Sequence, residues 1–391
     1  MELYCDGDRV YMARNYRIEG FSKKDLLERA EAVVVWQSEK LSDTPKKLVN
    51  TRFYLVGAGG SKLFRIDRRN GSKVEIDAGA EIIDITSNLR EVYFATPEGI
   101  YRVPAERCVE AEIKRLSISD LLDKPVKSLD LLGDHLFVIA GNFLYKLTKE
   151  GEMLYQKAFA EGIKVLSDYE GCVAVKRGEI VYFTEELEVL SNGAYEGEYV
   201  KVEHGAYNTF LLSDKSFSVF GKTGKRYAHV EDAHYESFTE GLNHIYFFDK
   251  EGKLSFSGKK DLLGDNFQEI DLTTLIAIIM ASLMLLEEKG NRVALKEEKG
   301  FIDLHINHKP VDVEKVILTL SRYFPEVFYL YKNPGYYDQI DTFAERFDLF
   351  KVEGKELRLN TLLLERLIQM HSTFKVFSED IVRGLVKLAE N

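Results

Sequence analysis

The sequence predicts an all-β, seven-bladed β-propeller followed by a smaller α+β domain. Three observations lead to this prediction: a hairpin pattern that recurs along the first two thirds of the chain, a composition suited to strands and turns, and a change to helical periodicity from residue 273. The 391 residues are 45% hydrophobic and include 21 Tyr and 24 Phe against one Trp, and 28 Gly against 7 Pro. Aromatic residues favour strands, and glycines favour tight turns. We therefore expect two domains, 1–272 and 273–391.

The first domain contains seven copies of an apolar strand, a tight turn and a second strand with an aromatic residue. Their starts lie about 36 to 50 residues apart, which is the size of a four-stranded blade. A short apolar strand precedes most copies, but the chain begins too close to the first copy to hold one. We expect residues 267–272 to supply that strand and close the ring, because closure removes exposed sheet edges. Two β-sandwiches are the alternative fold. The seven hairpins are expected over 3–12, 53–66, 92–103, 136–147, 173–183, 209–220 and 245–256.

Two of the copies carry a more specific pattern, in which a glycine precedes His or Asn by three residues. Gly241 and His244 lead into the seventh hairpin, and Gly205 and Asn208 lead into the sixth. These copies resemble the repeat of the regulator of chromosome condensation family. The resemblance implies a propeller that binds protein partners and, from the founding member, guanine-nucleotide exchange on a small GTPase. We expect His244 to brace its turn by hydrogen bonds to backbone and not to catalyse.

The second domain begins with a helix expected over 275–286, where about 12 apolar residues fall short of the roughly 20 that cross a bilayer. A strand led by Asp303, a tight turn, a second strand and a helix follow, and Ser321, Tyr323 and Phe324 end this segment. The segment resembles the opening of a BTB/POZ domain. The resemblance implies a eukaryotic protein whose second domain forms a homodimer or joins a cullin-type scaffold, as an adaptor of a ubiquitin ligase.

An assembly surface is expected on two segments of the second domain. In BTB proteins an N-terminal helix often builds the dimer interface, and the segment after the opening flanks the surface offered to a cullin-type scaffold. For the helix, packing between the two domains is the alternative role. The expected surface residues are Leu275, Ile279, Leu283, Leu286, Phe328, Leu330 and Tyr331.

No catalytic, cofactor-binding or metal-binding residues are expected. The segment 57–62 contains Gly57, Gly59 and Gly60, but Lys62 stands at the position where a dinucleotide fingerprint needs its last glycine. The segment also lacks the Gly-Lys-Ser/Thr of a phosphate loop. We interpret it as a hairpin turn. His305 and His308 lie three apart on a strand, so their side chains point to opposite faces. The acidic pairs 287–288 and 297–298 are interpreted as solvated clusters.

Charge and cysteine content narrow the partners and the compartment. The chain has 53 Lys and Arg against 64 Asp and Glu, a net charge of −11, which disfavours nucleic acid and a chromatin role. Cys5, Cys108 and Cys172 form no metal or disulfide pattern and fit a reducing compartment. The acidic N-terminus resembles no signal peptide, so a cytoplasmic or nuclear protein without membrane contact is expected.

These observations together predict a non-enzymatic adaptor without cofactors. In this interpretation the propeller binds a client protein and the second domain mediates assembly. Guanine-nucleotide exchange is the alternative function.

Overall fold

The computed structural model describes residues 1–298, 301–334, 350–353, 356–359, 365, 368–369 and 371–390. The chain divides into two compact units, Met1–Glu269 and Ile270–Asn391. Their boundary lies three residues before the one expected from the sequence. Within the described residues, no helix is long and apolar enough to cross a membrane.

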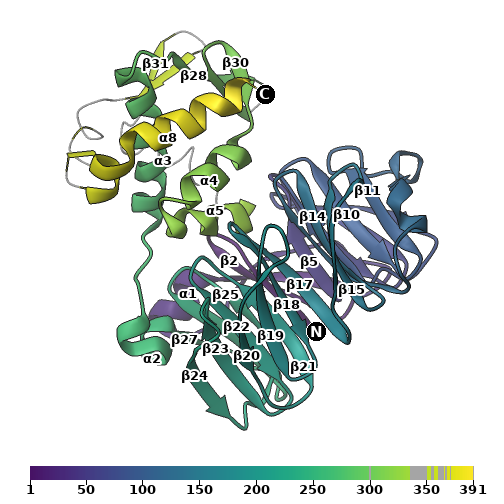
Figure 1. The fold of residues 1–391 in the computed structure, drawn as a ribbon. Coiled ribbons are helices and arrows are strands. Elements are labelled where there is room, and N and C mark those ends of the chain that lie inside the picture. The colour runs from purple at the N-terminus through teal and green to yellow at the C-terminus, as the bar shows by residue number, and fades with distance from the viewer. Residues whose placement is uncertain are drawn as a thin grey trace. The chain divides into compact units, whose positions relative to one another are not determined.

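The first unit, which is described throughout, consists of seven antiparallel sheets that follow one another along the chain (Figure 1). Six sheets have four strands each, and the seventh has three. The sheets comprise β1 (Glu2–Cys5), β2 (Arg9–Arg14), β3 (Arg17–Ser22) and β4 (Val34–Gln37); β5 (Lys47–Asn50), β6 (Tyr54–Gly59), β7 (Lys62–Asp67) and β8 (Lys73–Asp77); β9 (Asp84–Ser87), β10 (Glu91–Thr96), β11 (Gly99–Pro104) and β12 (Lys114–Arg115); β13 (Val126–Leu132), β14 (His135–Ala140), β15 (Phe143–Thr148) and β16 (Met153–Ala158); β17 (Gly162–Asp168), β18 (Gly171–Lys176), β19 (Glu179–Thr184) and β20 (Val189–Ala194); β21 (Tyr199–His204), β22 (Asn208–Ser213), β23 (Ser216–Gly221) and β24 (Arg226–Glu231); and β25 (Tyr235–Glu240), β26 (His244–Asp249) and β27 (Leu254–Gly258).

The first strands of successive sheets lie side by side in a closed series, from β1 through β5, β9, β13, β17 and β21 to β25, which again contacts β1. Neighbouring first strands run in the same direction. Asp84 accepts a hydrogen bond from the amide of Leu129 at 3.2 Å, and two residues further along both strands Thr86 accepts one from Leu131 at 3.3 Å. The predicted propeller-like architecture of repeated sheets is thus present in this unit.

Ring closure differs from the prediction. Residues 267–271 form no strand, so the expectation that 267–272 close the ring is wrong. Instead β1 supplies the first strand of the first sheet, because the alternating side chains of Leu3 and Cys5 are buried against the seventh sheet. Hairpin 3–12 therefore combines the first and second strands of its sheet, whereas hairpin 53–66 combines the second and third.

The seventh sheet lacks a fourth strand, and two short helices lie beside its edge strand β27. They are α1 (Lys23–Arg29), which follows β3, and α2 (Lys259–Leu263), which follows β27. Leu26 of α1 joins the same buried cluster as Leu254 of β27. Covering an edge strand in this way protects its unpaired backbone groups from pairing with other chains.

The second unit contains a sheet in the order β30-β29-β28-β32-β31 with helices packed around it. Helix α3 packs against α8 and β28. The helix, the hairpin and the following helix expected from the sequence are all observed. Its described elements are α3 (Leu272–Glu288), β28 (Val293–Glu298), β29 (Phe301–Ile306), β30 (Lys309–Val311), α4 (Val313–Ser321), α5 (Phe328–Lys332), β31 (Phe350–Glu353), β32 (Glu356–Leu359) and α8 (Ser372–Glu390).

Candidate functional site

A pocket of about 990 Å³ opens in the first unit where the first strands of the fourth, fifth and sixth sheets begin. Three kinds of segment line it: the starts of first strands, the connections that enter them, and the turns between second and third strands. We name this end of the ring the strand-start face. The charged residues that line the pocket are Lys127, Glu161, Arg177, Glu198, Asp214 and Lys215.

Local turn chemistry shapes the pocket. Gly178 and Gly197 have φ values of +75° and +89°, which side chains other than glycine rarely adopt. A Cβ on Gly197 would lie 2.3 Å from Oδ1 of Asp214, so only glycine lets these two turns approach each other. The same Asp214 oxygen accepts a hydrogen bond from the amide of Glu198 at 2.6 Å. The Asp214 carboxylate is therefore used in holding the turns together.

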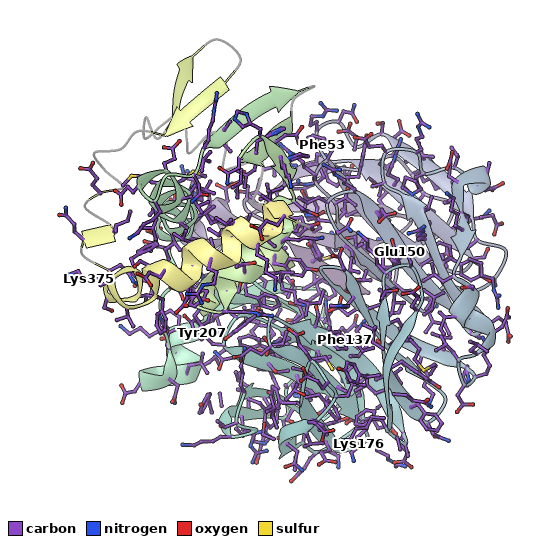
Figure 2. All side chains as sticks on the ribbon, turned by 45° about the horizontal axis from the view of Figure 1, so that its top comes forward. Phe53, Phe137, Glu150, Lys176, Tyr207 and Lys375 are labelled. Atoms are coloured by element: carbon purple, nitrogen blue, oxygen red, sulfur yellow. The ribbon has the colours of Figure 1, made fainter. Side chains whose placement is uncertain are left out.

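Two cations stand at the turn tips of the pocket without a partner. Arg177 and Lys215 are exposed, and across the described chain neither side chain makes a hydrogen bond or an ion pair. Lys176 (labelled in Figure 2) instead pairs with Glu179 at 2.6 Å across the turn that carries Arg177. Lys127 donates to the carbonyl of Gly141 at 2.7 Å. The unused cationic groups are thus those of the two turns.

Two carboxylates of the pocket are also unused. Glu161 and Glu198 are exposed, and in the described chain their side chains contact no donor.

Two tyrosines complete the wall, and burial raises the pKa of both Tyr195 and Tyr199. Their phenols are therefore neutral at physiological pH, and the hydroxyl of Tyr195 donates to the carbonyl of Lys176 at 3.0 Å. This set of groups suits binding better than proton transfer.

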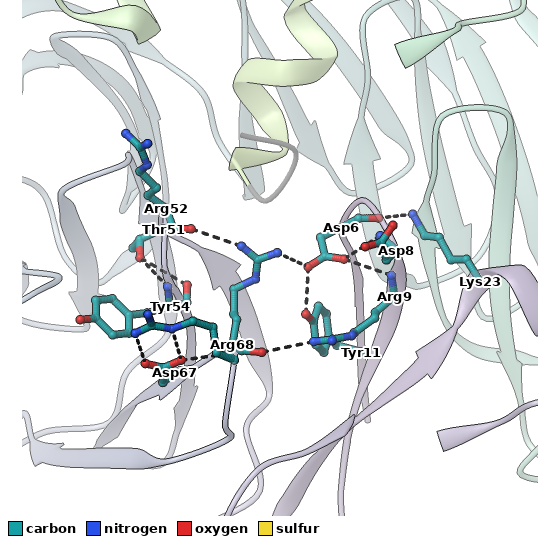
Figure 3. Close-up of polar contacts among 11 residues, drawn as sticks. Asp6, Asp8, Arg9, Tyr11, Lys23, Thr51, Arg52, Tyr54, Asp67 and Arg68 are labelled. Carbon is teal, nitrogen blue, oxygen red and sulfur yellow. Dashed lines mark hydrogen bonds and ion pairs between the residues drawn. The ribbon is translucent and has the colours of Figure 1, made fainter. Parts of the chain in front are cut away.

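At the opposite end of the first strands, which we name the strand-end face, two clusters of charged groups are buried and paired. Arg68 binds Asp6 at 2.6 Å across the junction of the first and second sheets (Figure 3). The side chains of Arg68 and Asp6 are only 11% and 3% exposed. The hydroxyl of Tyr11 donates to Asp6 at 2.9 Å, and Arg68 also donates to the carbonyl of Arg52 at 3.2 Å. A ligand has no free charge to bind in this network.

An equivalent pair lies between the fifth and sixth sheets. Lys222 binds Asp168 at 2.8 Å and lies 3.6 Å from the ring centre of Tyr169. Nε2 of His204 is 3.5 Å from the other Asp168 oxygen. Burial alone would raise the pKa of Asp168, but His204 and Lys222 together hold it far below its usual range. This carboxylate is ionised at every physiological pH.

The same junction contains a series of Asp, His and a hydroxyl group that resembles a catalytic triad. Nδ1 of His204 lies 2.9 Å from the hydroxyl of Thr209, which accepts a hydrogen bond from Tyr182 at 2.8 Å. Thr209 is completely buried, so no substrate can reach its hydroxyl. We interpret the series as a structural network.

In the interior of the ring, two ion pairs each join two sheets that are separated by one other sheet. Lys164 of the fifth sheet binds Asp84 of the third at 2.5 Å, and Lys201 of the sixth binds Glu2 of the first at 2.7 Å. Glu203 lies 3.1 Å from Lys201. Burial raises the pKa of Glu203 to about 7, although Lys201 and the amide of Glu240 act in the opposite direction. These charged side chains in the ring interior are therefore paired with each other.

The prediction that seven residues of the second unit form an assembly surface is wrong, because all seven are buried. The four on α3 belong to a run of apolar side chains in a helix that packs against α8 and β28, and Phe328 stacks on Tyr331 with ring centres 5.6 Å apart. These side chains form the core of the second unit. The buried residues are Leu275, Ile279, Leu283, Leu286, Phe328, Leu330 and Tyr331.

Three other expectations from the sequence concern short local segments. Segment 57–62 is the turn between β6 and β7 and its flanking residues, as predicted. The expectation that the His244 side chain braces its turn is wrong, because in the described chain its imidazole makes no hydrogen bond and packs on Phe256 with ring centres 5.8 Å apart. The turn is instead held by the main chain, where the carbonyl of His244 accepts a hydrogen bond from the amide of Gly241 at 2.8 Å. Burial lowers the pKa of His244, so the ring is neutral at pH 7. The side chains of the acidic pair 297–298 lie outside the described residues.

The remaining candidate ligands are dispersed. The expectation that His305 and His308 share a strand is wrong, because His308 lies in the turn between β29 and β30 with a φ of +69°. All three cysteines are free and buried. Among the described residues, no group of His, Cys, Asp and Glu is placed to hold a metal ion.

Sequence reasoning missed the pocket and both faces, although the repeats contain a signal for one of them. In five of the seven sheets a cation directly follows the third strand, which places these cations together at the strand-end face. Aligning the repeats by third strand would have found this set. The five cations are Lys23, Arg68, Lys149, Lys222 and Lys259.

The geometry defines a two-unit protein with a propeller-like first unit and a charged pocket on one face of it. No protein-family model matches the chain. An "Uncharacterized protein" of the bacterium Aquifex aeolicus (strain VF5) is 58% identical over 387 residues, 99% of this chain and 97% of that protein. The chain therefore belongs to the family of this Aquifex aeolicus protein. A bacterial relative gives no support to the eukaryotic origin expected from the BTB/POZ resemblance.

Two solved structures are similar to the chain in fold. The computationally designed Ika8 protein matches with a TM-score of 0.51 and 10% identity, over 66% of this chain and 82% of that one. A chain of the mitotic checkpoint complex matches with a TM-score of 0.52 and 10% identity, over 64% of this chain and 86% of that one. At such low identity the likeness concerns the fold alone, and it agrees with the propeller-like architecture.

Proposed function

We propose that the chain is a non-enzymatic protein-interaction scaffold whose first unit, a seven-bladed propeller, binds a polypeptide partner at the strand-start face. One observation carries the proposal: the pocket there holds exposed charged groups without partners in the described chain, whereas Asp6 and Asp168 at the strand-end face and Asp84 in the ring interior each pair with a cation. Unpaired charges around a concave surface are available to a ligand.

The chemistry of the pocket supports binding over catalysis. The guanidinium of Arg177 has only N–H donors and no acceptor, so it does not act as a base. The two tyrosines are neutral because burial raises the pKa of each. Propellers present loops and rims to partners and do not by themselves imply a reaction.

The pocket carries both signs of charge, and this favours a polypeptide over a nucleic acid. Arg177 and Lys215 are balanced by Glu161 and Glu198, so the wall has no excess of positive charge. Nucleic-acid sites are strongly positive because they neutralise phosphates. A polypeptide supplies groups of both signs.

The second unit is proposed as the assembly module, on the basis of its resemblance to the opening of a BTB/POZ domain. Because the seven expected residues are buried, contacts would use exposed apolar positions such as Val376 and Phe377 of α8, which are 70% and 40% exposed. Light scattering of the full chain tests this role, and a strict monomer at high concentration would remove it. Among the described residues, none favours a cullin-type scaffold or nucleotide exchange on a GTPase over other protein partners.

Quantitative affinity purification from the cells that natively produce the protein tests the proposed function. Three tagged forms are compared: wild type, Arg177→Ala/Lys215→Ala, and the matched control Arg107→Ala/Lys114→Ala. The control removes the same charges from two exposed positions, one in the connection between β11 and β12 and one in β12. We expect partners that wild type and control retain and the pocket variant loses. Identical sets of partners for all three forms would refute binding at the strand-start face.

A further inference from the structure

The unpaired carboxylates and cations of the pocket lie at different distances from the centre of the ring. Glu161 and Glu198 directly precede the first strands β17 and β21, which belong to the closed inner series. Arg177 and Lys215 lie in the turns between second and third strands, which are further from the ring centre because the strands follow each other outward in each sheet. The carboxylates are thus on the inner side of the pocket and the cations on its outer side.

Strand geometry sets the scale of this separation. Neighbouring strands of a sheet lie about 4.8 Å apart, so a turn between second and third strands is about 5 to 10 Å outward of the first strand. The two remaining charged groups of the wall already make hydrogen bonds within the chain. Asp214 accepts one from the amide of Glu198, and Lys127 donates one to the carbonyl of Gly141. The pocket therefore offers a ligand one negative and one positive region, several ångströms apart.

An extended polypeptide matches this spacing. Residues two apart on an extended chain point to the same side and are separated by about 6.6 Å, at about 3.3 Å per residue. A pocket of about 990 Å³ is large enough for such a segment, because sites for single small ligands begin at about 300 Å³.

We propose that the pocket binds an extended segment carrying a basic and an acidic residue two positions apart, the basic side chain beside Glu161 and Glu198 and the acidic one beside Arg177 and Lys215. This inference rests on the proposed function and specifies its ligand. The ligand is recognised by the order of its charges across the pocket and not by its net charge.

Calorimetric titration of the full chain with four capped nine-residue Gly/Ser peptides tests the inference. The central triplet of the peptides is Lys-Ser-Glu, Lys-Ser-Lys, Glu-Ser-Glu or Ser-Ser-Ser. We expect the Lys-Ser-Glu peptide to bind at least tenfold more tightly than the other three. Equal affinities, or a preference for a peptide of one charge sign, would overturn the inference.

Charge reversal provides the matched test in the protein. Arg177→Glu/Lys215→Glu makes all four unused groups acidic, so it should lose the Lys-Ser-Glu preference and bind Lys-Ser-Lys most tightly. The control Arg107→Glu/Lys114→Glu should keep the wild-type order, and a control that changes in the same way would overturn the inference.

Failure of this inference and failure of the proposed function give different results. If no peptide binds up to millimolar concentration while Arg177→Ala/Lys215→Ala still loses cellular partners, the charge-order inference is wrong and the binding face stands. If the variant loses no partners, the proposed function itself is wrong.

Discussion

Two clusters of charged residues at opposite ends of the ring differ in whether their charges are paired. At the strand-end face, Asp6 with Arg68 and Asp168 with Lys222 are buried and hydrogen-bonded. At the strand-start face, Arg177 and Lys215 are exposed and their side chains contact no acidic group in the described chain. Burying a charge costs free energy unless a partner compensates it, so paired charges at one end hold sheets together. Unpaired charges at the other end remain available to a partner.

Removal of Asp168 should have the largest effect on stability. Asp168→Ala leaves Lys222 and His204 without their shared partner in a buried junction, and we expect a loss of about 3 to 5 kcal/mol in the free energy of unfolding. Urea titration followed by fluorescence measures this, because the one tryptophan, Trp36, lies buried in the first unit. Glu198→Ala at the strand-start face is the control, with an expected change below about 0.5 kcal/mol. Similar losses for both variants would contradict the difference between the faces.

Protonation of Glu203 should make stability depend on pH between about 4.5 and 7. Burial raises its folded-state pKa from 4.5 to about 7, so the folded state favours the neutral carboxyl. Its stabilising contribution is complete below pH 4.5 and is lost as the pH rises through 7, a change of about 3 kcal/mol at 1.36 kcal/mol per pKa unit. Urea titrations at several pH values should show a smaller decrease for Glu203→Gln than for wild type. An unchanged slope in the variant would contradict this account of the ring interior.

Loss of a single hydrogen bond at the strand-end face should have a moderate effect. Tyr11→Phe removes the donor to Asp6 but leaves Arg68 in place, so we expect a loss of about 1 to 2 kcal/mol. Urea unfolding monitored at Trp36 provides the measurement. Tyr16→Phe, at an exposed residue whose hydroxyl makes no hydrogen bond in the described chain, should change stability by less than about 0.5 kcal/mol. If Tyr11→Phe left the free energy of unfolding unchanged, the Asp6 network would not be needed for stability.

The smallest effect on stability is expected for the pocket cations. Arg177→Ala/Lys215→Ala removes two exposed side chains without partners, so its free energy of unfolding should lie within about 0.5 kcal/mol of wild type. Urea titration beside the binding measurements separates loss of binding from loss of folding. A large destabilisation would mean that these cations have a structural role after all.

The sequence predicts the propeller-like repeats because alternating apolar strands and glycine turns recur at a fixed spacing. It does not show how the ring closes, since β1 has the same pattern as a second strand and only its packing against Tyr246 and Phe248 gives it the first position. It also misplaces Leu275 and Leu286, because a uniformly apolar helix looks the same at an interface and in a core. The pocket is not predictable from local pattern, since Arg177 and Lys215 lie 38 positions apart and meet only when successive sheets align.

Site-specific photo-crosslinking shows directly whether a polypeptide binds at the strand-start face. Full-length Lys215→p-benzoylphenylalanine and Lys114→p-benzoylphenylalanine are expressed in the native cells, irradiated and compared by mass spectrometry of the covalent adducts. Binding at the strand-start face predicts adducts to a polypeptide from position 215 and none of these from position 114. Equal adducts from both positions, or adducts from position 114 alone, would contradict it.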